Sequence, residues 1–380
     1  MIVRQFLQWI QTALPGERAD ATSALARAYL HSDLTQEDRL AAEAAMTVLL
    51  DDPSPLVRRA LADVLSSSAE APQTLVLALA NDQPEIAEIV VARSPLLTEA
   101  ELVDLIGEAN ERIQNAIASR VPVPASLAAA VAEVGCAGAC LVLIENPDAD
   151  VTPASLARIA ERHDMLAAIR ERLLVHPELP VETRQALVAT LSSTLARFVT
   201  EREWLPEDRA QKVTREACDR ATVALAAATE VDRVAPLVRH LRLSGQLTGG
   251  LVLRALLSGN VHFLVEALAD LTNLSPRRVA AILDDPARHA FRALYECAGL
   301  PRAAFGAFKA ALEVIQEMGF DDTAHGYAVL RRRIIERVLE RYQRAAPGEL
   351  DQLLSLLRRL AAEATRDEAR SFTADLVAAA

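Results

Sequence analysis

The stretch Ala92-Arg93-Ser94-Pro95-Leu96-Leu97 is a proline-marked turn that recurs along the first half of the chain. The later copies are Arg120-Val121-Pro122, Asn146-Pro147 and His176-Pro177, and the successive prolines lie 27, 25 and 30 residues apart. Apolar helical patterns lie on both sides of each turn. Pairs of helices that recur at such a period are typical of solenoids, in which each pair buries its apolar face against the next. The sequence therefore predicts an all-α fold that begins as an αα-hairpin solenoid.

The segments between the turns carry apolar residues at spacings of three and four. Leu102, Leu105 and Ile106 form one such set, and Ile113 and Ile117 form the next. This spacing places each set on one face of a helix. Because a buried aliphatic side chain contributes about 1.5–3 kcal/mol, we expect these faces to supply most of the stability of the array.

The segment from Asp51 onwards resembles the second helix of a HEAT repeat, with an acidic turn, a Val-Arg pair and periodic Ala and Leu. The matching residues are Asp52, Val57, Arg58, Ala60 and Leu61. Asp82 and Ile86 repeat the turn thirty residues later, although Glu88 and Ile89 replace the arginines. We therefore expect the solenoid to be HEAT-like.

Breaks in the pattern predict four regions. We expect an N-terminal helical cap over 1–50, HEAT-like repeats over 51–200, a second helical domain over 206–345 and a terminal amphipathic helix over 346–380. The charged segment 200–208 marks the main boundary, and Leu243–Gly250 contains three of the thirteen glycines, so it predicts a turn. Helices are expected over 17–30, 36–50, 206–228, 230–242, 249–258, 260–271, 275–283, 286–298, 301–318, 323–345 and 348–378.

Together these features resemble the family catalogued as domain of unknown function 2336, whose mostly alphaproteobacterial members look like HEAT-type helical arrays. The residues that carry the resemblance are the Ala92–Leu97 turn and its copies, with the runs Leu251–Asn260, Phe263–Ala269, Val279–Asp285 and Ala298–Pro301. It covers about residues 40 to 345. The resemblance implies a helical array and supplies no reaction, cofactor or catalytic residue.

The composition favours a cytoplasmic protein that does not enter a membrane. No run of eighteen uninterrupted apolar residues occurs, and the N-terminus is too polar for a signal peptide. Residues 1–110 hold seventeen acidic and seven basic side chains and so account for −10 of the net charge of −12. This acidity either keeps the array soluble or attracts a basic protein partner, and it makes nucleic acid an unfavourable ligand.

No set of residues predicts catalysis, a cofactor or a metal site. The pair Cys136 and Cys140 lies one helical turn apart without a second Cys/His pair, so we expect both thiols to pack in the core. His176 occupies the turn position of Asn146, and His289 lacks the neighbouring residues of a phosphoacceptor motif. Some HEAT-like arrays are DNA glycosylases, but the acidic composition and the presence of only two tryptophans oppose that alternative.

One helix carries a candidate contact surface. Arg333, Arg337, Arg341 and Arg344 recur at spacings of four, four and three, which places them on one stripe, with Arg331 and Arg332 at its start. Such a stripe can hold phosphate or an acidic partner. Glu336 and Glu340 lie within it, so a solvated, salt-bridged face is the alternative interpretation.

We therefore expect a non-enzymatic scaffold or adaptor that binds a protein partner. The alternative function is a regulatory module that binds an anionic ligand or nucleic acid through the arginine stripe. Self-association is a third hypothesis, because Leu350, Leu353, Leu354, Leu357 and Leu360 form an apolar stripe on the last helix. That stripe can also pack within its own chain, which is the simpler expectation.

Overall fold

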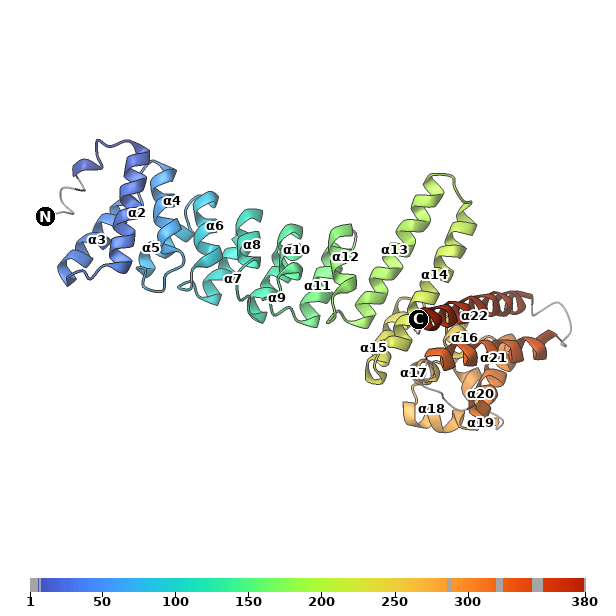
Figure 1. Cartoon of the computed structure of the whole chain (residues 1–380). Helices are drawn as coiled ribbons and strands as arrows, with labels where there is room; N and C mark the ends of the chain where they lie inside the picture. Colours follow the sequence, from blue (N-terminus) through green and yellow to red (C-terminus); the bar gives the residue numbers. More distant parts are fainter. Residues whose placement is uncertain are drawn as a thin grey trace. The chain divides into compact units, whose positions relative to one another are not determined.

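A computed structural model gives the fold (Figure 1). It describes residues 6, 8–108, 110–285, 289–318, 324–343 and 351–378, and in the last two helices it describes the side chains of 331–340, 354–370 and 373. Within these ranges the regular elements are helices, and one isolated β-bridge joins Val123 and Ala149. The all-α prediction is confirmed. None of the described helices is both long and apolar enough to cross a membrane.

The chain divides into two compact units, Met1–Pro180 and Val181–Ala380. The boundary differs from the break expected near residues 200–206. The charged segment there is the turn of a hairpin between α13 (Val181–Glu201) and α14 (Glu207–Ala228), two helices that contact each other extensively. A charged turn interrupts an apolar pattern in the same way as a linker does, so the sequence alone did not distinguish the two.

The first unit consists of short helices that follow one another in pairs. They are α2 (Pro15–His31), α3 (Gln36–Leu49), α4 (Pro55–Leu65), α5 (Gln73–Ala80), α6 (Pro84–Arg93), α7 (Glu99–Glu108), α8 (Glu111–Ala118), α9 (Ala125–Val134), α10 (Ala137–Glu145), α11 (Pro153–His163) and α12 (Ala167–Val175). Thr35 caps α3 by accepting from the backbone N–H of Asp38. Proline occupies the first turn of α2, α4, α6 and α11.

Alternate helices of this unit pack on each other. From α4 to α12 each even-numbered helix contacts the next even-numbered one, and α9 contacts both α7 and α11. The apolar faces predicted from the spacing lie in these contacts, and Ile117, Leu127 and Leu173 are fully buried. Each pair therefore depends on its neighbours for a core.

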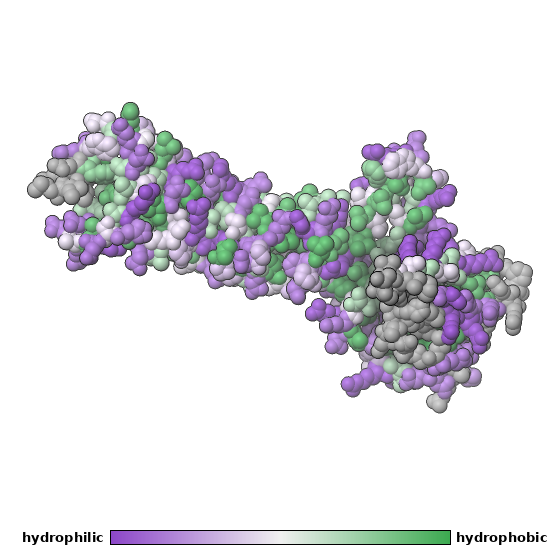
Figure 2. Space-filling model, viewed as in Figure 1, coloured by the Kyte–Doolittle hydropathy of each residue, from purple (hydrophilic) through white to green (hydrophobic). Residues whose placement is uncertain are grey.

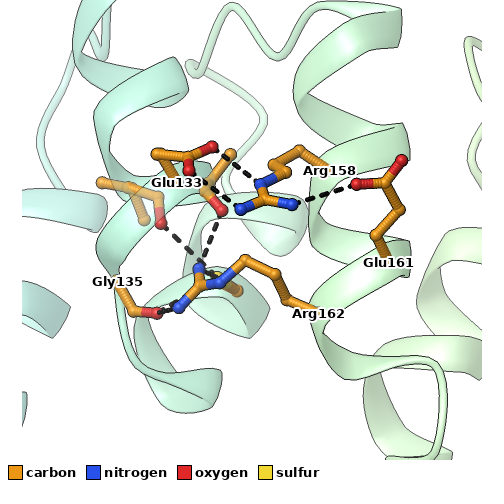
Figure 3. A network of polar contacts seen from close by, with 8 residues as sticks. Glu133, Gly135, Arg158, Glu161 and Arg162 are labelled. Carbon is orange, nitrogen blue, oxygen red and sulfur yellow. Dashed lines mark hydrogen bonds and ion pairs between the residues drawn. The ribbon is translucent and has the colours of Figure 1, made fainter.

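Polar side chains join each pair to an adjacent one. Arg162 of α11 donates to the carbonyl oxygens of Ala132 and Gly135, both at 2.8 Å, at the end of α9 (Figure 3). Asn146 likewise donates to the carbonyls of Ala118 and Arg120, both at 2.9 Å. Helix ends leave carbonyls without intrahelical partners, so these donors satisfy them. Arg162 of α11 and Asn146 at the end of α10 thus act as caps between pairs.

The acidic turns of the HEAT-like pattern have the same role. The Asp52 carboxylate lies 2.8 Å from Arg18 Nη2, and the Asp82 carboxylate lies 2.7 Å from Arg58 Nε. Arg58 also donates to the carbonyl oxygen of Asp52 at 2.7 Å. Asp52 and Asp82, which lie thirty residues apart, therefore form ion pairs with an arginine of α2 and an arginine of α4, respectively.

The second unit has longer helices around one core. Besides α13 and α14 it contains α15 (Val231–Leu243), α16 (Gly249–Leu257), α17 (Val261–Thr272), α18 (Pro276–Leu283), α19 (His289–Cys297), a 3₁₀ turn (Arg302–Ala304), α20 (Phe305–Met318), α21 (Ala324–Gln343) and α22 (Asp351–Ala378). These bounds confirm the expected helices closely, although the segment 301–304 belongs to the 3₁₀ turn and its start. Gly245 has a φ of 70° in the turn between α15 and α16, a conformation that glycine adopts readily.

The core of this unit draws on residues far apart in sequence. Leu256, Phe263, Phe308, Ile334 and Leu357 are each fully buried in a single hydrophobic cluster. Leu357 and Leu360 of α22 therefore pack within their own chain, as the simpler expectation for this stripe held. Leu350 lies outside the described residues, and so does the side chain of Leu353.

Candidate functional site

The arginine stripe predicted from the sequence lies on α21, and the structure describes two of its side chains. Arg333 and Arg337 are both exposed, one helical turn apart. The side chain of Arg341 and the whole of Arg344 lie outside the described residues. On the opposite face of the helix, Ile334, Val338 and Leu339 are buried.

The two arginines that begin this run form ion pairs with α22. Arg331 Nη1 lies 2.7 Å from Asp367 Oδ2, and Arg332 Nη1 lies 2.7 Å from Glu368 Oε2. Arg332 also pairs with Glu336 on its own helix at 3.1 Å, which fits the salt-bridged interpretation of that face. These pairs join α21 to α22.

Arginines from three other helices converge on Glu363 of α22. Its Oε1 lies 2.6 Å from Arg220 Nη2 of α14. Its Oε2 lies 2.9 Å from Arg254 Nη1 of α16 and 3.6 Å from Arg331 Nη2 of α21. One carboxylate thus connects four helices, and it has two oxygens for three guanidinium groups.

Arg254 is the deepest member of this cluster. Only 3% of its surface is exposed, and it stands within the otherwise apolar run of α16. Burial raises the pKa of the Asp219 carboxyl on α14, and the nearby charge of Arg254 opposes that rise. A buried cation is costly unless it is paired, so Arg254 depends on its carboxylate partners.

Sequence reasoning missed the Arg254–Glu363 pair, although a signal for half of it existed. A single charged residue inside the apolar run Leu251–Leu257 indicates a buried charge that needs a partner. Nothing in the sequence identified that partner, because Glu363 lies 109 residues away.

A cavity of about 730 Å³ adjoins this cluster. Its lining comes from α14 to α17, α21 and α22, and its polar members include Arg220, Arg254, Arg331, Asn260 and His262. Valine and alanine side chains of α14, α15 and α17 form most of the remaining wall. The volume lies in the range of small-molecule sites, about 300–1,000 Å³.

A second candidate surface runs along α13. Leu191, Leu195 and Phe198 follow one another at spacings of four and three and are 42%, 51% and 41% exposed. The ring of Phe198 meets that of Trp204 edge-on, with centroids 5.7 Å apart, and Trp204 is 62% exposed. Figure 2 shows hydrophobic residues along the body of the α13–α14 hairpin and hydrophilic residues at its tip. We call these four residues the α13 stripe.

The cysteines are free thiols on α10, α14 and α19 or at the start of α10. No group of three or more His, Cys, Asp or Glu side chains in the described part of the chain could hold a metal ion. Burial raises the pKa of the Cys140 thiol to about 11, which disfavours the thiolate that chemistry would need. His176 is the C-cap of α12, as Asn146 is of α10, so the predicted equivalence of these two turn positions is confirmed.

Comparison with known protein families gives a match over the second half of the first unit and most of the second unit. The sequence profile of a bacterial family, described as "Uncharacterised protein conserved in bacteria (DUF2336)", matches residues 86–348, more than half of the chain. No curated protein matches, and no solved structure matches.

Proposed function

We propose that this chain, which belongs to the DUF2336 family of bacterial proteins, is a non-enzymatic cytoplasmic scaffold or adaptor that binds another protein. Its first unit would be a HEAT-like solenoid. The contacts between successive helix pairs, and the caps that recur from pair to pair, support that arrangement. Solenoids present extended surfaces on which partners bind.

The α13 stripe is the observation that carries the proposal. Large apolar side chains that are half-exposed and contiguous on a helix are uncommon on the surface of a monomer and mark interaction sites. Aromatic residues such as Phe198 and Trp204 are also the anchors that dominate protein interfaces.

The chemistry of the stripe indicates an amphipathic helix as the partner. Residues at spacings of three and four form a narrow ridge that matches the apolar face of another helix. Arg202 lies over the Phe198 ring, 4.4 Å from its centroid, and over the Trp204 ring at 5.6 Å. This cation at the end of the stripe favours a partner whose apolar face ends in an acidic residue.

The test replaces Leu195 and Phe198 with Asp in the full chain and compares capture from an extract of the native organism. Ser193→Asp is the matched control, since Ser193 is exposed on the same helix but lies off the stripe. We expect a protein that binds the native chain and the control and is lost with the double variant. A partner retained equally by all three chains would exclude the α13 stripe, and turnover of a metabolite would contradict the non-enzymatic proposal.

A second candidate function is the binding of nucleic acid or another anionic ligand at Arg333 and Arg337. Two exposed guanidinium groups one turn apart can hold phosphates. Replacing both with Glu should abolish binding of a fluorescent oligonucleotide in an anisotropy titration at low salt. Equal binding by the native chain and the variant would remove this candidate.

A further inference from the structure

The cavity beside Glu363 has a wall with more positive than negative charge. Among its described lining residues are three arginines, Arg220, Arg254 and Arg331, and one carboxylate, Asp367. Glu363 forms ion pairs with all three arginines, so its two carboxylate oxygens are shared among three guanidinium groups. Glu363 and Asp367 are the two carboxylates that form ion pairs with these three guanidinium groups. The Asp219 carboxyl lies near Arg254 but outside the lining, so the wall of the cavity itself carries more positive than negative charge.

The wall also has more hydrogen-bond donors than acceptors. Asn260 caps α17 and accepts from the Phe263 N–H at 3.0 Å, while its buried Nδ2 has no acceptor among the described residues. The buried Nε of Arg331 likewise has none in that part of the chain. Buried donors without acceptors cost free energy. The start of α17 adds the partial positive charge of a helix N-terminus to the same wall.

The rest of the cavity is apolar. Val223, Val234 and Val261 line it together with the exposed Ala224 and Ala227 of α14. A ligand that fills this volume must therefore bring apolar surface as well as charge. An inorganic anion would satisfy the arginines and leave most of the cavity unfilled.

From this combination we infer that the cavity binds a small monovalent organic anion with an apolar body, whose carboxylate meets the cluster of Arg220, Arg254 and Arg331. Glu363 holds these arginines in place in the free protein and competes with the ligand for them. The site is separate from the α13 stripe and does not depend on the proposed scaffold function.

Calorimetric titration of the full chain with decanoate tests the site, and decan-1-ol and inorganic phosphate serve as probes that lack the charge or the apolar body. We expect decanoate to bind at one site per chain and the other two probes to bind at least about tenfold more weakly, the ratio expected when one charge-assisted contact is lost. Equal binding of decan-1-ol would show an unspecific apolar cavity and overturn the inference. Absence of decanoate binding would overturn it as well.

Two tryptophan variants locate the binding. Ala224→Trp places a large side chain at an exposed position in the cavity lining and should lower decanoate affinity at least about tenfold. Ala217→Trp, at an exposed position on the same helix outside the lining, should leave it unchanged. Equal affinities of the two variants would place the ligand elsewhere and overturn the assignment.

Substitutions that remove a positive or a negative charge from the cluster should change the affinity for decanoate in opposite directions. Arg220→Ala removes one cation and should weaken decanoate binding severalfold, whereas Glu363→Gln removes the competitor and should strengthen it about tenfold. A decrease with Glu363→Gln in a folded protein, verified by circular dichroism, would contradict the role given to the arginines. If that variant does not fold, the two tryptophan variants and Arg220→Ala decide the inference.

Discussion

Polar contacts between helices of residues 1–180 join positions about one repeat apart, whereas some of those in residues 181–380 join positions more than a hundred residues apart. The Asn146 and Arg162 caps span 28 and 30 residues. The bonds from Arg254 and Arg220 to Glu363 span 109 and 143 residues. Helices of the first unit contact mainly their neighbours in sequence, while the second unit also depends on points where helices distant in sequence meet. We therefore expect a destabilising substitution to affect mainly neighbouring helices in the first unit and to affect helices distant in sequence in the second.

The largest effect is expected from a charge in the buried face of the array. Ile117→Asp places a carboxylate at a fully buried position, and we expect a loss of more than about 4 kcal/mol in the free energy of unfolding of the first unit. Hydrogen exchange should show lost protection within residues 1–180 and retained protection in 181–380. Val175→Asp, at a position 74% exposed, is the control. Loss of protection in both units would contradict the expectation that the effect stays within the first unit.

The next largest loss of stability is expected at Glu363, where arginines from three helices of the second unit meet. Glu363→Ala leaves the buried Arg254 without its nearest carboxylate and should cost about 3–5 kcal/mol in urea unfolding of this unit. Glu296→Ala removes a carboxylate that forms an exposed ion pair with Arg292 within α19, and we expect almost no change in stability from it. A similar loss from both variants would mean that Glu363 is not a point of convergence.

A smaller effect distinguishes the two arginines of Figure 3. Arg162→Ala removes the donors to the carbonyls of Ala132 and Gly135 and should cost about 1–3 kcal/mol in thermal or urea unfolding. Arg158 forms exposed pairs with Glu133 and Glu161, so Arg158→Ala should change stability far less. The reverse order would indicate that ion pairs, and not the caps, join the helix pairs.

The smallest expected effect is a dependence of stability on pH, and it can be compared between one histidine of each unit. Burial lowers the pKa of His163 and of His240 below the ordinary value of 6.5, and each has a buried Nε2 without a partner among the described residues. The unfolded chain then binds protons more readily than the folded one as the pH falls below about 6.5, so stability is complete above that pH and decreases below it.

Unfolding measured at several pH values between 7.5 and 5 tests this effect. His163→Gln should reduce the acid loss in the first unit and His240→Gln the loss in the second. His31→Gln, at an exposed position at the end of α2, controls for the removal of one imidazole. An unchanged slope in both buried variants would contradict the assignment.

The helices could be predicted closely because their signals are local. Thr35 before α3, the proline turns and the glycine-containing turn before α16 are each recognised within a few residues. The sequence predicts a boundary near residues 200–206, where the structure has the turn between α13 and α14, because a charged turn and a linker have similar compositions. The exposure of Arg333 and Arg337 also agrees with the spacing on which the stripe was predicted.

The helical class, most helix ends and the buried faces of the helices in the first unit could be predicted from the sequence, because hydrophobic periodicity and capping are local signals. That Arg220, Arg254 and Arg331 share one carboxylate and adjoin one cavity follows from the tertiary packing. No local pattern specifies which distant helix supplies Glu363. The pairing forms when the apolar faces of α14, α16, α21 and α22 pack against one another. Because an unpaired buried guanidinium is costly, only a packing that brings a carboxylate next to Arg254 is stable.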